Sequence, residues 1–144
     1  MAPDTYFGEA IGPECRSGLD WRDEMATEVI VTDEFRAWYE GLSEGEQDRV
    51  YRTIGLLETY GVTLGFPHSS AIEGASFALR ELRTQVKGDP LRTLYAFDPS
   101  RQAVLLIGGD KTGDDRFYEH LIPVAEKLWR DYLEETGQAK PKKK

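Results

Sequence analysis

A succession of short strands and tight turns over residues 77–116 constrains the fold more than any other stretch. Residues 98–101 (Asp-Pro-Ser-Arg) have Asp first and Pro second, which is typical of a type I turn and predicts a tight hairpin. Residues 87–90 (Lys-Gly-Asp-Pro) predict another turn. The run AVLLI at 103–107 is apolar throughout and should be the most buried strand. We therefore expect a small meander of neighbouring strands.

Cationic side chains lie at or near the ends of these strands. Arg83 falls at the end of a strand expected over residues 78–84. Arg92 begins the strand expected over 91–97, and Lys111 follows the last strand. Because strand side chains alternate between two faces, the mixed polarity of residues 78–84 on both faces suits a strand that opens onto a cleft at one end. The cations predict that this surface holds an anion.

Two helices are expected before the meander, after a first strand at residues 27–31 (TEVIV). Thr32 or Asp33 can cap the first helix. Ser43 and Glu46 have the spacing of a capping box and predict the start of the second. The short connection between them indicates a helical hairpin laid on the sheet.

A third helix is expected after the meander. Residues 63–75 break all periodicity and predict a loop into the meander. The loop at 110–113 leads to a helix capped by Asp114 or Asp115, which Pro123 could kink or divide. The predicted order is β-α-α-β-β-β-α, in an α+β fold.

The length of 144 residues fits one globular domain. We expect an N-terminal extension at residues 1–24, loosely ordered or packed over the domain, the domain itself at 25–136, and a basic tail at 137–144. The single cysteine, Cys15, cannot form an internal disulfide. No leader and no run of about 18 apolar residues is visible, so a soluble cytoplasmic protein without membrane contact is expected.

The net charge of −8 argues against a generic nucleic-acid binder, because phosphate contacts need clustered Lys and Arg. The acidity is unevenly distributed. Residues 1–75 carry 5 Lys and Arg against 15 Asp and Glu, whereas residues 76–116 carry 7 against 6. The meander is therefore neutral to basic within an acidic chain.

Two familiar kinds of site do not fit this sequence. The stretch GGDKT at 108–112 fails as a phosphate-binding loop, because Asp110 and Leu106 stand where that motif needs glycine. Two separated histidines and one cysteine form no metal-ligand cluster, so we expect neither a metal nor a cofactor. His68 could act as a general base, but it has no partner in sequence and is otherwise a loop residue.

The remaining candidates for chemistry are Arg83, Arg92, Lys111, Tyr95 and Tyr118. Cleavage of a phosphodiester needs charge stabilisation on a pentacovalent phosphorus, a base for the attacking oxygen and an acid for the leaving oxygen. Two arginine forks could clamp the phosphate, the lysine could add a third cation, and a tyrosine could stack a base. The alternative is that these cations only form salt bridges with Glu81, Asp89 and Asp110.

Three segments carry a family resemblance when they are taken together. ELR at 81–83, LRTLY at 91–95 and KTGDDRFY at 111–118 resemble, in this order and spacing, the HigB-like toxins of type II toxin–antitoxin modules, within the RelE/ParE superfamily. The resemblance implies a two-helix hairpin on a small, twisted, mainly antiparallel sheet, with a C-terminal helix. It also implies a ribosome-dependent, metal-independent endoribonuclease that cleaves mRNA through attack by the RNA 2′-hydroxyl.

The resemblance also implies roles for single residues. The catalytic set it implies is Arg83, Arg92, Lys111 and Tyr118. We further expect RNA contacts at Glu81, Tyr95 and Arg116. Glu81 stands where ribosome-dependent ribonucleases often have a lysine, which leaves the general base open.

The expected partners are mRNA on the ribosome and a cognate helix-turn-helix antitoxin. Two other functions remain open from the sequence. One is a ParE-like toxin that inhibits DNA gyrase without cutting RNA. The other is a non-catalytic interaction module whose acidic half binds a basic partner.

Overall fold

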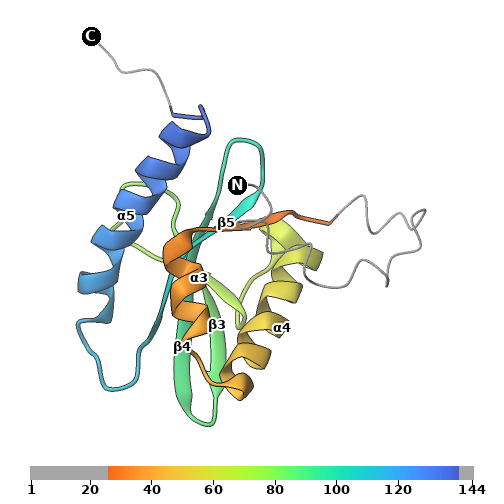
Figure 1. The fold of residues 1–144 in the computed structure, drawn as a ribbon, viewed down its shortest axis with the longest axis vertical. Coiled ribbons are helices and arrows are strands. Elements are labelled where there is room, and N and C mark those ends of the chain that lie inside the picture. The colour runs from red at the N-terminus through yellow and green to blue at the C-terminus, as the bar shows by residue number, and fades with distance from the viewer. Residues whose placement is uncertain (1–25, 140–144) are drawn as a thin grey trace.

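The structure, a computed structural model, describes residues 26–139 (Figure 1). The expected extension at 1–24 lies outside the described residues, as does most of the expected tail at 137–144. The elements in chain order are β1 (Val29–Val31), α3 (Asp33–Glu40), α4 (Glu44–Tyr60), η3 (Gly61–Thr63), β2 (Ser69–Ala71), β3 (Arg80–Val86), β4 (Asp89–Phe97), β5 (Ala103–Asp110) and α5 (Phe117–Glu135).

All five strands form one sheet in the order β1-β5-β4-β3-β2. β1 runs parallel to β5, and every other neighbouring pair is antiparallel. The α+β fold with a mainly antiparallel sheet is thus confirmed, and it is the fold expected of RelE-like toxins.

Helices cover both faces of the sheet (Figure 1). On one face α3 and α4 bury a core that includes Phe35, Ile54, Leu57, Leu82 and Leu105. On the other face α5 buries a smaller core that includes Leu79, Leu94, Leu106, Phe117 and Ala125. Because side chains alternate along a strand, β4 and β5 contribute to both cores. The sheet is therefore the middle layer of three.

The helical hairpin has the predicted caps. The Thr32 hydroxyl accepts a hydrogen bond from the Phe35 amide at 2.9 Å and so begins α3. The Ser43 hydroxyl accepts from the Glu46 amide at 3.2 Å, while the Glu46 carboxylate accepts from the Ser43 amide at 2.9 Å. This reciprocal capping box satisfies two amides that the first turn of α4 leaves without helical partners.

Two local predictions were wrong. The expected loop at 63–75 contains β2, which pairs with residues 80–82 of β3; its three residues, Ser-Ser-Ala, have no apolar alternation that would reveal a strand. The helix α5 is not capped by Asp114 or Asp115. Its N-cap residue is Arg116, which makes no side-chain cap, and Asp114 instead accepts a hydrogen bond from the Arg116 amide in the preceding turn. α5 also runs undivided through Pro123.

Two glycines lie inside β5 where the helices come closest to the sheet. A Cβ on Gly108 would collide with the indole of Trp38 on α3. A Cβ on Gly109 would lie 2.8 Å from the ring of Phe117 and 3.2 Å from Leu121, both on α5. The stretch GGDKT therefore begins as strand and not as a loop, and its glycines serve helix–sheet packing.

Candidate active site

Arg83 and Arg92 are brought together by the β3–β4 hairpin. Lys87 and Gly88 form its turn with φ of 48° and 89°, the left-handed conformations that two-residue hairpins favour. This turn fixes a register in which Arg83 and Arg92 are direct partners. Directly opposed residues on an antiparallel pair lie on the same face with their Cβ atoms about 5 Å apart. The two guanidinium groups thus start from neighbouring positions on the sheet.

Glu81 is the centre of the polar cluster around this pair. Its side chain is buried, with only 4% of the residue exposed. Its Oε1 accepts a hydrogen bond of 2.6 Å from the hydroxyl of Tyr118. Its Oε2 accepts from the Ser70 hydroxyl at 2.8 Å and from Nη1 of Arg83 at 3.3 Å. One carboxylate therefore joins β2, β3 and the first turn of α5.

Arg92 is the most deeply placed cation of the cluster, with 5% of the residue exposed. Its Nη1 donates to the carbonyl oxygen of Leu91 at 3.1 Å. Its Nε lies 3.6 Å from Oε1 of Glu81, which is an ion-pair distance but too long for a hydrogen bond. Within residues 26–139 this buried Nε has no hydrogen-bond partner. A buried donor left without an acceptor is unfavourable, so this Nε costs the folded protein free energy.

Tyr118 and Lys111 close one side of the cluster. Burial, together with the hydrogen bond to Glu81 and the charge of that carboxylate, raises the pKa of Tyr118 to about 12, although the charge of Arg92 acts in the opposite direction. The phenol therefore stays protonated at neutral pH. The Nζ of Lys111 lies 5.1 Å from the centre of the Tyr118 ring, a cation–π distance.

Two predicted RNA contacts lie elsewhere. Tyr95 is fully buried in the core under α3 and α4, and its hydroxyl is hydrogen-bonded to Ser69 at 2.6 Å. It has no surface on which a base could stack. Arg116 is exposed at the start of α5 and pairs with Glu119 at 2.9 Å.

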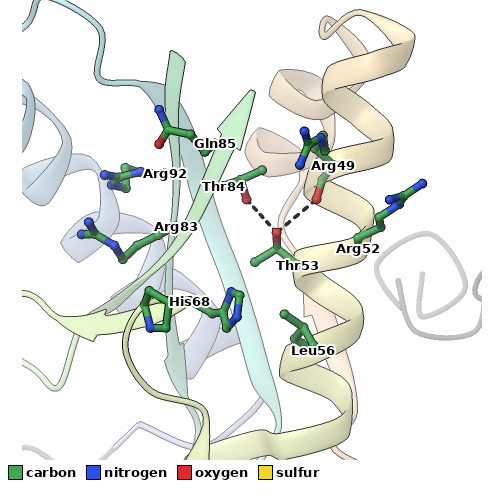
Figure 2. A pocket seen from close by; sticks show the side chains of 10 residues that line it. Arg49, Arg52, Thr53, Leu56, His68, Arg83, Thr84, Gln85 and Arg92 are labelled. Carbon is green, nitrogen blue, oxygen red and sulfur yellow. Dashed lines mark hydrogen bonds between the residues drawn. The ribbon is translucent and has the colours of Figure 1, made fainter. Parts of the chain in front are cut away.

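A groove continues from Arg83 across the edge of β3 toward α4 (Figure 2). Its lining includes Arg49 and Arg52 from α4, His68 from the loop before β2, and Arg83 and Arg92. No carboxylate of the described residues lines it. This chain of net charge −8 therefore has an anion-attracting channel on its surface.

Comparison with known proteins assigns the family. The family described as phage derived protein Gp49-like matches residues 37–130. The Mycobacterium tuberculosis protein named "Putative toxin HigB3" is 38% identical over 107 residues, which are 73% of this chain and 92% of that relative. The chain belongs to the Gp49-like family of HigB-type toxins.

A second relative of this HigB-like toxin agrees with that assignment. The M. tuberculosis protein named "Putative toxin HigB2" is 33% identical over 111 residues, 75% of this chain. The match spans 55% of that relative, about half its length. No solved structure matches the chain. Within residues 26–139 no helix of this HigB-like toxin is long and apolar enough to cross a membrane.

Sequence reasoning missed the half of the groove that comes from α4 in this HigB-like toxin. Arg49 and Arg52 belong to the acidic first part of the chain, whose average charge concealed them. Their spacing of three residues on a helix was the available signal, since it places both on one face. His68 was considered, but only the fold brings it to the same groove as Arg83.

Proposed function

We propose that this toxin is a metal-independent endoribonuclease that cleaves mRNA on the ribosome. The observation that carries the proposal is the opposition of Arg83 and Arg92 on one face of the sheet, joined to Tyr118 through Glu81. Two forked cations and a protonated phenol are the groups that a phosphodiester needs when its phosphorus becomes pentacovalent.

The proposed reaction is a transesterification within the RNA. The 2′-hydroxyl oxygen attacks the adjacent phosphorus and gives up its proton to a base. A new O2′–P bond forms as the P–O5′ bond breaks, and the 5′ oxygen receives a proton from an acid. The products are a 2′,3′-cyclic phosphate and a 5′-hydroxyl, so no water and no redox partner is consumed.

The side chains divide these tasks by their chemistry. Arg83, Arg92 and Lys111 stabilise the charge on the phosphoryl oxygens. Tyr118 donates the proton to the leaving oxygen, because its phenol is the hydroxyl that Glu81 holds beside the arginine pair. His68 is our candidate for the base, since imidazole is the commonest general base in proteins and this one lines the same groove as both arginines.

Glu81 has a positioning role in this scheme. Its carboxylate is buried and already accepts hydrogen bonds from Tyr118, Ser70 and Arg83, so it has no free surface for RNA. It holds the arginine pair and the phenol in one arrangement. In this scheme Glu81 does not contact RNA as expected, but acts through the residues that it positions.

The toxin–antitoxin class of the family supports an antitoxin partner. We propose that a cognate helix-turn-helix antitoxin neutralises the toxin in the cytoplasm. Covering the cationic cluster would suffice, because the arginine pair and Tyr118 then lose access to RNA.

Induction of the toxin in growing cells tests the proposal. Transcript 5′ ends should accumulate at internal sites of translated mRNAs and carry a free hydroxyl, and Arg83→Ala should abolish them. Purified toxin should cut the same mRNA only when ribosomes are added. Intact transcripts with a supercoiling defect would show a gyrase inhibitor instead. Intact transcripts with unperturbed growth would show a non-catalytic interaction module.

A further inference from the structure

We propose that the groove between α4 and the open edge of β3 is a second RNA-binding site, which holds the single-stranded RNA that flanks the scissile phosphate. The inference rests on the proposed cleavage at the Arg83–Arg92 pair. It adds a phosphate-binding row, Arg49 and Arg52, and a base-stacking ring, Phe66, that the reaction itself does not require.

The edge of β3 is open beside this groove. β2 pairs with β3 only at residues 80–82. One further bond follows, from the Arg83 amide to the carbonyl oxygen of His68 at 2.8 Å. None of the described strands pairs with residues 84–86 on that side. An extended chain can therefore pass from the arginine pair over this edge without displacing a strand.

Arg49 and Arg52 place positive charge on the opposite wall. Both are exposed on α4, one helical turn apart, and Figure 2 shows the Arg52 side chain extending away from β3, so it must turn back to reach RNA in the groove. Arg52 pairs with Asp48 at 3.0 Å, but both side chains of that pair are more than half exposed. Exposed pairs of this kind contribute little, so Arg52 can exchange its carboxylate for a phosphate.

Buried hydroxyl groups hold the two walls of the groove together. The hydroxyl of Thr84 on β3 donates to the hydroxyl of Thr53 on α4 at 3.0 Å, and Thr53 donates to the carbonyl oxygen of Arg49 at 3.1 Å (Figure 2). These bonds connect the backbone that carries Arg49 to the strand that carries Arg83. The separation between the two cationic rows is therefore set by the core and does not depend on ligand.

Phe66 provides the aromatic surface that Tyr95 cannot. It is 77% exposed, the most exposed of the large apolar side chains within residues 26–139. The guanidinium carbon of Arg83 lies 5.2 Å from the centre of its ring. Stacking of bases on aromatic rings beside a cationic track is how proteins bind single-stranded nucleic acid. This pairing favours RNA over an acidic peptide as the occupant.

Fluorescence anisotropy with 2′-O-methyl oligoribonucleotides, which cannot be cleaved, tests the groove. Wild-type toxin should bind an oligonucleotide of about nine residues more tightly than a dinucleotide. A plot of log K against log salt has a negative slope, and each lost phosphate contact on a single strand reduces its magnitude by about 0.7. Arg49→Gln/Arg52→Gln should therefore reduce the magnitude by about 1.4 for the longer RNA. Dinucleotide binding should not change.

The chain offers a matched control on α5. Lys127 and Arg130 have the same spacing as Arg49 and Arg52, and Lys127 forms an exposed i,i+4 pair with Asp131 as Arg52 does with Asp48. Lys127→Gln/Arg130→Gln should therefore retain the wild-type slope. Phe66→Ala should weaken binding of the longer RNA about tenfold without changing the slope, within the range for one stacked base. Tyr60→Ala, at another exposed aromatic residue, should not.

Several outcomes would overturn the groove. The first is equal affinity of the wild type for both RNA lengths, and the second is a wild-type slope in Arg49→Gln/Arg52→Gln. The third is that this double variant loses binding to an acidic peptide of the antitoxin while its RNA binding stays intact. Any of them can coexist with mRNA cleavage in cells, in which case only the groove is wrong. A reduced slope in a toxin that cuts no mRNA would instead retain the groove and refute the cleavage. Matching circular dichroism and melting curves for all variants exclude misfolding.

Discussion

Arg83 and Arg92 lie directly opposite each other across β3 and β4, two like charges on one face of the sheet. Such a pair is unfavourable by itself. Glu81 offsets it, at 3.3 Å from the nearest nitrogen of Arg83 and 3.6 Å from that of Arg92. Two cations share one carboxylate, so the cluster retains a positive excess that a phosphate can neutralise.

Removal of a phosphate-stabilising cation should abolish toxicity. We expect Arg83→Gln or Lys111→Gln to relieve growth arrest and to lower mRNA cleavage about 100-fold or more, as loss of one transition-state donor does. Colony counts after induction and mapping of 5′ ends provide the measurement. Lys127→Gln serves as the control. Full toxicity of both single variants and of the double variant would show that these residues do not form the clamp.

Glu81 should be needed for stability as well as for positioning. Glu81→Ala leaves Arg92 buried without its counter-charge, and breaking a buried ion pair typically costs about 3–5 kcal/mol of unfolding free energy. Glu81→Gln keeps an oxygen that can accept from Tyr118, so its loss should be smaller. Urea unfolding followed by circular dichroism measures both. Equal stability of the alanine variant and the wild type would contradict the buried network.

The pKa of Tyr118 predicts an alkaline transition. The folded protein holds the phenolic proton more tightly than an unfolded chain, whose tyrosine titrates near 10. The stability gained is therefore complete below about pH 10 and is lost as the pH rises toward about 12. Ultraviolet difference titration of wild type against Tyr118→Phe isolates this phenol. Glu81→Gln should lower its pKa toward 10, and a wild-type midpoint already at 10 would refute the assignment.

A second carboxylate fastens α5 to the β4–β5 hairpin. Asp98 is buried and accepts from the Tyr132 hydroxyl at 2.7 Å, from the Gln102 amide at 2.8 Å and from the side chain of Gln138 at 3.2 Å. Tyr132→Phe removes one of these bonds and should cost about 1–3 kcal/mol. Thermal unfolding measures the loss. A melting temperature equal to that of the wild type would show that this bond contributes nothing.

The sequence predicted the fold where its signals are local. The Ser43 capping box, the hairpin turn after Asp98 and the apolar run in β5 each follow from residues within a few positions of one another. β2 was missed because its pairing depends on a distant strand. The burial of Tyr95 was missed because it depends on α3 and α4, which cover its face of β4 only in the folded protein.

The candidate site was predictable in part for the same reason. Arg83 and Arg92 sit on adjacent strands of one hairpin, so spacing alone suggested that they meet. Arg49 reaches the groove only because α4 packs on β3, a contact that no local pattern encodes. Phe66 stood in a segment expected to be a plain loop, and only its exposure beside Arg83 distinguishes it.

Gly109 makes the position of Tyr118 sensitive to a substitution that changes no charge. The missing methyl group lets the ring of Phe117 settle against β5, and Phe117 directly precedes Tyr118 in the first turn of α5. The distance between the Tyr118 hydroxyl and Glu81 therefore depends on how closely α5 packs against β5. Gly109→Ala would act as a spacer, lifting the start of α5 and drawing the proton donor away from the arginine pair while every ionisable group remains in the chain.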